Sequence, residues 1–284
     1  MAETWTVRSL LQWAREWLAK KAVENPRLDA ELLLAHALGC DRLRLYIDID
    51  KPVTADELAR FKPLIQRRGA REPVAYILSA KEFYGRRFLV APGVFIPRPE
   101  TELLVRIVLD RLEKGAPGRV LDLCAGSGAV GVSVAAERLE ARVDLVELSP
   151  EAVEVARRNA EAHASGRARV LEGDLYAALP EQVRYHAIAA NPPYVPIAHA
   201  EKLAPEILTE PHLALFGGAD GLLVIRRIVS GLADWLAPGG WFVTEIDPPQ
   251  SKAVAQMLRD AGLSQVRVER DLAGLDRHVL GKGR

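Results

Sequence analysis

The sequence predicts an α/β protein with a largely parallel sheet, preceded by a small helical domain. From Val7 to about Arg71 the apolar residues recur at helical spacing. From Arg119 onward, short apolar stretches typical of strands alternate with helical stretches, which is the pattern of parallel sheets whose strands are joined by helices. The chain of 284 residues also exceeds the usual size of one domain, about 100–200 residues, so a large domain and a smaller one are expected.

Residues 1–75 are expected to form the N-terminal helical domain. Thr54 and Glu57 fit a capping box, in which each residue satisfies a backbone N–H of the other at the start of a helix. Pro63 falls within the last helical stretch and should kink or divide it, because proline cannot donate a backbone hydrogen bond.

Residues 76–98 are expected to form a connector, and residues 99–284 the larger domain. In the connector, "EFYGRRFLV" predicts a β-hairpin that reverses at Gly85, and the proline-rich stretch "APGVFIPRPETE" follows. The expected strands of the larger domain are "RVLDLC", "ARVDLVEL", "ARVLEG", "HAIAAN", "WFVTEI", "QVRVER" and "HVLGK".

Charge and composition exclude several classes of protein. The 38 basic residues balance 38 acidic ones, so no net charge attracts nucleic acid or an anionic membrane. We find no leader peptide and no apolar run of the roughly 20 residues needed to cross a bilayer. Cys40 and Cys124 are too few for a disulfide framework, and the six histidines show no metal-ligand spacing. We therefore expect a cytoplasmic protein with no metal and no direct contact with membranes or nucleic acid.

A glycine-rich loop follows the first strand of the larger domain. In "VLDLCAGSGAVG" a buried-type strand runs directly into Gly126, Gly128 and Gly131, and a helical stretch follows. Glycines at this place allow the backbone to approach a ligand that faces the helix N-terminus. The spacing fits both NAD and S-adenosylmethionine, and it also fits a tight strand-to-helix turn that binds nothing.

Acidic residues at the ends of the next two strands favour an adenosine ligand. Glu147 ends the second strand, where a carboxylate can accept hydrogen bonds from both ribose hydroxyls, and Ser149 should cap the helix that follows. The third strand delivers Asp174 and Leu175, which could bind the adenine amino group and ring. A solvated strand end and a surface turn are the plainer alternatives.

The fourth strand ends in "NPPY", residues 191–194. Two adjacent prolines cannot continue a sheet ladder and leave a stiff, extended segment. The Asn191 side-chain carbonyl and the Pro192 backbone carbonyl then form a pair of acceptors that matches one NH₂ group, with Tyr194 packed against its plane. This geometry predicts methyl transfer to a planar amide or amine, because such a poor nucleophile must be held and aimed. A simple strand terminator is the structural alternative.

These motifs together resemble the class I S-adenosylmethionine-dependent amino methyltransferases. More specifically, the chain resembles the peptide chain release factor glutamine methyltransferases, the PrmC/HemK family. The likeness extends from about residue 25 to the end and rests on "REPVAYILSAKEFYG", "FIPRPETE", "NPPY", "EPHLALFGGADGL", "LAPGGWFVTEI" and "DLAGLDRHVLG". It implies a Rossmann-like sheet, mostly parallel with the last strand antiparallel.

The resemblance also implies a reaction, a cofactor and a partner. The reaction is methylation, by S-adenosylmethionine, of the N5 nitrogen of the Gly-Gly-Gln glutamine in bacterial class I release factors, by a protein expected to be a monomer. The implied catalytic residues are Asn191, Pro192 and Tyr194. The substrate-binding set adds Pro193 and Arg98. The cofactor-binding set is Phe95, Thr101, Asp122, Gly126, Gly128, Glu147, Asp174, Leu175 and Asn191. Two departures are visible: Cys124 and Ala125 replace the usual glycine and threonine, and "EIDPPQ" stands where "EIG" is usual.

Two other functions remain open from the residues alone. A nucleic-acid adenine-N6 or cytosine-N4 methyltransferase presents the same two-hydrogen problem, but it must flip its base and usually has a basic face. A non-catalytic sensor of adenosine nucleotides is the second alternative. Arg67, Arg68 and Arg71 could contribute to docking a protein substrate, although a solvated helix end is the preferred interpretation.

Overall fold

The computed structural model describes residues 5–180 and 183–284, which divide into two compact units. The helical unit comprises the described residues up to Ala80 together with Ala204–Thr209. The sheet unit comprises Lys81–Leu203 and Glu210–Arg284. Nothing in the sequence pattern predicted that Ala204–Thr209 would return to the helical unit. Residues 1–4 of the expected first domain lie outside the described residues.

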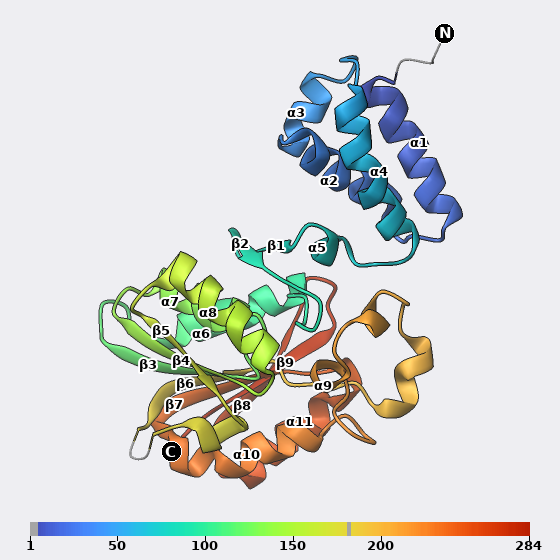
Figure 1. Ribbon diagram of the computed structural model, residues 1–284. Coiled ribbons are helices and arrows are strands. Elements are labelled where there is room, and N and C mark those ends of the chain that lie inside the picture. Colours follow the sequence, from blue (N-terminus) through green and yellow to red (C-terminus); the bar gives the residue numbers. More distant parts are fainter. Residues whose placement is uncertain (1–4, 181–182) are drawn as a thin grey trace. The chain divides into compact units, whose positions relative to one another are not determined.

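The helical unit contains the helices α1 (Val7–Lys20), α2 (Pro26–Leu38), α3 (Arg42–Ile47), α4 (Ala55–Gly69) and α5 (Val74–Ile77) (Figure 1). The capping box at the start of α4 is confirmed: Thr54 N donates to Glu57 Oε2 at 2.8 Å, and Glu57 N donates to Thr54 Oγ1 at 3.3 Å. Thr6 and Ser9 cap α1 in the same way. These bonds satisfy N–H groups that have no partner inside the helix.

Helix α4 continues through Pro63 to Gly69, so of the two expected effects, a kink or a division, the division does not occur. Pro63 lies between Phe61 and Ile65, which are both 2% exposed and belong to the core of the helical unit. A proline inside a helix costs about 3 kcal/mol. Burial of two large apolar side chains on either side of it stabilises the helix by a similar amount.

The arginines at the end of α4 are not a solvated helix end, which corrects the expectation for Arg68. This residue is 5% exposed, and its Nε donates to Asp29 at 2.6 Å. Arg68 Nη2 also donates to Glu206 at 2.8 Å, while Arg71 donates to both carboxylate oxygens of Glu206. Burial alone would raise the pKa of Glu206, but the hydrogen bonds from the two arginines lower it to about 2. Arg67 pairs with the more exposed Glu72.

The described residues of the sheet unit form a seven-stranded sheet of order β5-β4-β3-β6-β7-β9-β8. The strands are β3 (Gly118–Leu123), β4 (Ala141–Glu147), β5 (Ala168–Glu172), β6 (Tyr185–Ala190), β7 (Leu236–Glu245), β8 (Ser264–Arg270) and β9 (Asp276–Lys282). Strands β3 to β7 pair in parallel, and β9 is antiparallel to both β7 and β8. The predicted mostly parallel sheet with an antiparallel last strand is confirmed.

The predicted hairpin is also confirmed, as β1 (Ala80–Phe83) and β2 (Arg86–Leu89). Its turn places Tyr84 and Gly85 at φ values of 48° and 70°. Positive φ at both central residues is typical of the two-residue turns that match the twist of antiparallel strands.

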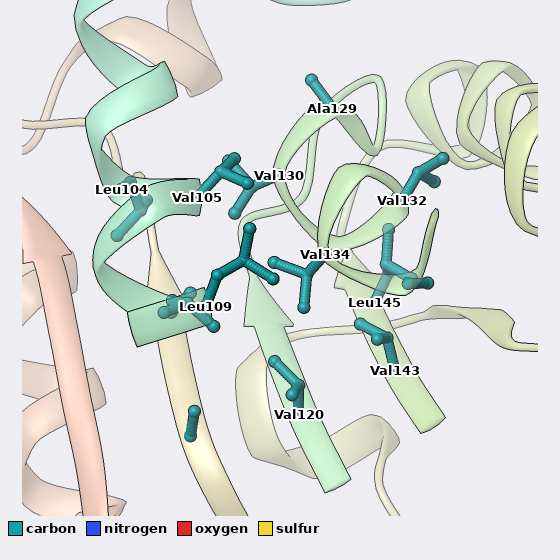
Figure 2. Close-up of a cluster of buried hydrophobic side chains, with 14 of the residues drawn as sticks. Leu104, Val105, Leu109, Val120, Ala129, Val130, Val132, Val134, Val143 and Leu145 are labelled. Carbon is teal, nitrogen blue, oxygen red and sulfur yellow. The ribbon is translucent and has the colours of Figure 1, made fainter. Parts of the chain in front are cut away.

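Helices cover both faces of the large sheet (Figure 1). One face carries α6 (Glu102–Arg111), α7 (Ala129–Glu137) and α8 (Pro150–Ala164), and the other carries α10 (Leu223–Trp235) and α11 (Ser251–Asp260). Figure 2 shows the first layer, where Val105 and Leu109 of α6 meet Val130 and Val134 of α7 above Val120 of β3. Because both faces are buried, the central strands are continuously apolar rather than alternating.

Irregular segments and short helices occupy the carboxyl edge of the sheet. They include η1 (Pro99–Thr101), η2 (Leu175–Ala178), η3 (Ile197–Lys202), α9 (His212–Leu215) and η5 (Pro248–Gln250), whereas η4 (Ile207–Thr209) belongs to the helical unit. Within residues 5–180 and 183–284, no helix combines the length and apolar character that a membrane span requires.

Candidate active site

The predicted site motifs meet at the carboxyl edge of the sheet. The glycine loop follows β3 and the NPPY segment follows β6, and these two strands are neighbours at the centre of the sheet. From β3 the chain proceeds outward to β4 and β5, whereas β6 leads in the other direction to β7. Strands β3 and β6 therefore flank the point where the strand order reverses, which is where open α/β sheets bind their ligands.

The glycine loop has the tight turn that its sequence predicted. Gly126 and Gly128 have φ values of 55° and 80°, in the left-handed region that glycine adopts without strain. Cys124 occupies the same region at φ 58°, where a side chain is disfavoured. A Cβ at Gly131 would lie 2.8 Å from Leu145 Cγ, so this glycine allows α7 to pack closely on β4. Burial raises the pKa of the Cys124 thiol, which is therefore a poor nucleophile.

Glu147 holds its carboxylate over the glycine loop. Its Oε2 accepts from Gly126 N at 2.7 Å, and its Oε1 accepts from Leu148 N at 2.8 Å and Ser149 N at 2.9 Å. Backbone bonds to both oxygens fix the position of the carboxylate. The predicted helix cap is confirmed, since Ser149 Oγ accepts from Ala152 N at 3.3 Å.

Asp122 points into the sheet unit rather than into solvent. The residue is 1% exposed, and its Oδ2 accepts from Gly131 N at 2.7 Å, at the beginning of α7. Burial raises the pKa of Asp122 to about 7, the Gly131 hydrogen bond opposes this shift, and the charge of Glu147 adds to it. Asp122 therefore binds the first turn of α7 from the interior of the sheet unit and fixes the start of this helix.

Asp174 and Leu175 follow β5, on the far side of β4 from the glycine loop. Asp174 Oδ2 accepts from Arg227 Nη2 of α10 at 2.8 Å, and both side chains are about half exposed. Leu175 is 8% exposed and belongs to the apolar cluster beneath α10. The residue before Asp174, Gly173, donates its N–H to the Glu147 carbonyl at 2.9 Å, which ties this segment to the end of β4.

The NPPY segment is held by side chains from distant parts of the sequence. Asn191 Nδ2 donates to Thr101 Oγ1 at 3.3 Å, and Thr101 Oγ1 donates to Glu245 Oε2 at 2.7 Å. Tyr194 OH donates to Glu245 Oε1 at 3.0 Å. Burial raises the pKa of Tyr194, and the Glu245 charge raises it further, so the phenol stays protonated and acts as the donor. None of the described residues donates to Asn191 Oδ1.

The backbone of the same segment is packed against two glycines and one amide. Gln250 Nε2 donates to the Tyr194 carbonyl at 2.9 Å. A Cβ at Gly217 would lie 2.4 Å from the Pro193 carbonyl oxygen, and one at Gly221 would lie 2.0 Å from the Tyr194 carbonyl oxygen. Backbone therefore approaches backbone at these points, which leaves no room for any side chain.

Phe95 and Arg98 lie together at the connector. The Arg98 guanidinium is 4.8 Å from the centroid of the Phe95 ring, and it forms an ion pair with Glu210. Glu210 is 3% exposed and also accepts from Ile96 N at 3.0 Å. The charge of Arg98 is therefore neutralised by a buried carboxylate, which fixes the guanidinium above the ring.

Sequence reasoning missed Glu245, Gln250, Glu210 and Arg227. A signal existed for Glu245, which ends β7 as Glu147 ends β4, because an acid at the end of a parallel strand is placed at the ligand-binding edge. No local pattern marks Gln250 or Glu210. Their roles arise only when the chain folds and brings them to Tyr194 and Arg98.

Both the N-terminal part and the larger part of the chain match known protein families. Residues 9–78 match the PrmC N-terminal domain, and residues 85–237 match the Methyltransferase small domain. The release factor glutamine methyltransferase of Geobacter sulfurreducens is 44% identical over 281 residues, covering 99% of this chain and 98% of that protein. The protein of the same name from Burkholderia pseudomallei is 45% identical over 90% of this chain and 91% of its own length.

Solved structures support the same fold. A methyltransferase from Pyrococcus furiosus aligns with a TM-score of 0.54 at 19% identity, covering 78% of this chain and 98% of its own. The 16S rRNA N2 G1207 methyltransferase of T. thermophilus, solved in complex with AdoMet and guanosine, aligns with a TM-score of 0.52 at 25% identity, covering 72% of this chain and 50% of its own. With nearly full-length identity of 44% to a curated relative, the chain belongs to the family of release factor glutamine methyltransferases.

Proposed function

We propose that this protein transfers the methyl group of S-adenosylmethionine to the N5 nitrogen of the glutamine in the Gly-Gly-Gln motif of bacterial class I release factors. The observation that carries the proposal is the orientation of Asn191. Its Nδ2 donates to Thr101, which leaves Oδ1 to accept an N–H beside the Pro192 carbonyl. The relatives are named for glutamine and release factors, and this supports the choice of substrate.

The cofactor would be held by the glycine loop and Glu147. Two backbone bonds occupy Oε1 of Glu147 and one occupies Oε2, so Oε2 keeps a lone pair for a ribose hydroxyl. A Cβ at Gly126 would lie 3.9 Å from Phe95 Cβ. Because Gly126 has no side chain, its backbone faces Phe95 directly. In this proposal Asp122 and Gly128 shape the loop, and Asp174 and Leu175 bind the adenine end. Residues of this type fit an adenosine ligand.

When bound, S-adenosylmethionine supplies an electrophilic sulfonium methyl group. The protein's part is to hold the amide nitrogen: Asn191 Oδ1 and the Pro192 carbonyl each accept one N–H, and this aims the remaining face of the nitrogen at the methyl carbon. As the nitrogen becomes cationic, both acceptors stabilise the growing positive charge on its hydrogens. The extra proton then passes to water, so no strong base is required before attack.

Tyr194, Pro193 and the pair of Phe95 and Arg98 complete the proposed glutamine subsite. Tyr194 is fixed by its bond to Glu245 and packs beside the amide plane. Arg98 stacks on Phe95 and is neutralised by Glu210, so the pair offers a flat cationic-aromatic wall with little excess charge. This wall suits the backbone of a glycine-rich loop, which brings no bulky side chain.

We further propose that the protein acts as a cytoplasmic monomer whose partner is the folded release factor. The helical domain, residues 1–75, would provide docking surface, with residues 76–98 as connector and residues 99–284 as the catalytic domain. The equal numbers of basic and acidic residues favour a protein partner over nucleic acid or membrane.

The test is mass spectrometry of a purified release factor after incubation with this protein and labelled S-adenosylmethionine. We expect one methyl group on the Gly-Gly-Gln glutamine, and none when that glutamine is replaced by glutamate. Duplex DNA, free glutamine and a short peptide should be poor substrates. Asn191→Ala should lower kcat on the order of 10² or more, since orientation is the main catalytic contribution. Label on DNA, or full activity of Asn191→Ala, would overturn the proposal.

A further inference from the structure

The buried carboxylate of Glu245 joins the two ends of the NPPY segment. Glu245 ends β7 and is 1% exposed. Its Oε2 accepts from Thr101 at 2.7 Å and its Oε1 accepts from Tyr194 at 3.0 Å. Thr101 is 3% exposed and in turn accepts from Asn191. His278 Nε2 lies 3.5 Å from Glu245 Oε2, on the neighbouring strand β9.

The chemistry of this chain of bonds sets the direction of each hydrogen. A hydroxyl has one hydrogen to donate. An ionised carboxylate can only accept, so the Thr101 hydrogen is committed to Glu245, and Thr101 Oγ1 must accept from its other neighbour. Asn191 therefore has to present its NH₂ to Thr101 and its Oδ1 to the opposite side. The hydrogen bond that Glu245 accepts from Thr101 thus decides which end of the Asn191 amide faces the substrate.

We propose that Glu245 is a positioning residue for methyl transfer, which acts through Thr101 to orient the Asn191 amide and through its own contact to fix Tyr194. This inference rests on the proposed function of Asn191 as an acceptor for the glutamine N–H. If the Asn191 amide were reversed, its NH₂ group would face the NH₂ group of the substrate glutamine. The substrate nitrogen would then lose one of its two acceptors.

The orientation can be measured without substrate, because the chain contains only three asparagines, Asn25, Asn159 and Asn191. Selective ¹⁵N-asparagine labelling therefore gives three side-chain NH₂ signals. Asn159 is a matched internal control, since its Nδ2 donates to the carbonyls of Leu89 and Ser127 at 3.0 and 2.8 Å. Glu245→Gln and Thr101→Val should move the Asn191 NH₂ signal and speed its hydrogen exchange while leaving the Asn159 signal in place.

Activity gives the second readout. The Thr101 and Tyr194 hydroxyls both donate to Glu245. The amide of Glu245→Gln has one oxygen acceptor and one NH₂ donor, so one of these hydroxyls must become an acceptor. We expect kcat to fall on the order of 10–100-fold, with the KM for the release factor and the affinity for S-adenosylmethionine changed by less than about 3-fold. Thr101→Val should lose kcat similarly, and Thr101→Ser should recover most of it because the hydroxyl is kept.

A matched control separates positioning from general stability. Tyr185 is fully buried and its OH donates to Asp144 at 2.8 Å, like the phenol of Tyr194 on Glu245. Tyr185→Phe should lower stability and leave kcat unchanged, whereas Tyr194→Phe should lower kcat. An unmoved Asn191 signal in Glu245→Gln, or wild-type kcat in Glu245→Gln and Thr101→Val, would overturn the inference. Absence of methyl transfer by the wild-type protein would instead overturn the proposed function, and the NMR result would still decide the orientation.

Discussion

Replacing Asp122 by asparagine should change how the stability of the sheet unit depends on pH. Asp122 has a folded-state pKa of about 7 against 3.8 for an unperturbed aspartate, because its carboxyl is 1% exposed. The pKa difference is about 3, and at about 1.4 kcal/mol per pKa unit the ionised form costs the folded state at most about 4 kcal/mol. The folded state is free of this cost below pH 3.8, where Asp122 is protonated in both states. Its stability then falls as the pH rises through 7.

Asparagine is nearly isosteric, can still accept from Gly131 and does not ionise. The free energy of unfolding of Asp122→Asn should therefore rise relative to the wild type by about 2–3 kcal/mol between pH 5 and pH 8. Native-state hydrogen exchange of β3 amides, corrected for intrinsic exchange rates at each pH, measures this difference within the sheet unit. A difference that stays constant or falls with pH would refute the reasoning. It would mean that the N-terminus of α7 keeps the carboxylate ionised despite its burial.

Three further substitutions have defined outcomes. Glu147→Ala should weaken binding of S-adenosylmethionine about tenfold or more in calorimetry, because the charge-assisted hydrogen bond from Glu147 Oε2 to the ribose is lost. Equal affinity would place the ribose elsewhere. Cys124→Gly should stabilise the sheet unit by about 0.5–1 kcal/mol in urea unfolding. Glycine removes the strain of a side chain at a φ of 58°, and this gain exceeds the entropic cost of ordering a glycine. A loss of stability would show that packing of the thiol matters more. Glu206→Gln should destabilise the helical unit by about 2 kcal/mol, because Arg68 and Arg71 lose a shared carboxylate. Faster hydrogen exchange of the α4 amides would measure this loss. Unchanged exchange would mean that water replaces the Glu206 carboxylate.

Much of the fold could be predicted because it is encoded locally. The strands of the large sheet, the hairpin at Gly85 and the caps at Thr54 and Ser149 all depend on neighbouring residues. Glu147 could be placed for the same reason, since it ends a strand next to the glycine loop. Local periodicity and strand polarity are enough to bring such residues to one edge of a sheet.

The remainder depends on contacts between distant residues. Glu245 meets Thr101 across 144 positions of the sequence and Tyr194 across 51. A basic residue at a helix end is normally solvated, but Arg68 is buried and pairs with Glu206, which lies 138 residues away in the sequence. Local pattern also could not predict that the side chain of Asp122 would face Gly131 in the interior, because β3 is buried on both faces.

The return of Ala204–Thr209 to the helical unit has a consequence for protein synthesis. Arg68 and Arg71 leave the ribosome 138 and 135 residues before Glu206. At about 5–20 residues per second, Glu206 is synthesised roughly 7–28 s after the two arginines. Throughout that interval the glycine loop, β3 to β6 and the NPPY segment are being translated. The helical unit is therefore completed only after most of the catalytic machinery exists. A truncated chain ending before residue 204 lacks the carboxylate that Arg68 and Arg71 share and leaves Asp29 as the acidic partner of Arg68.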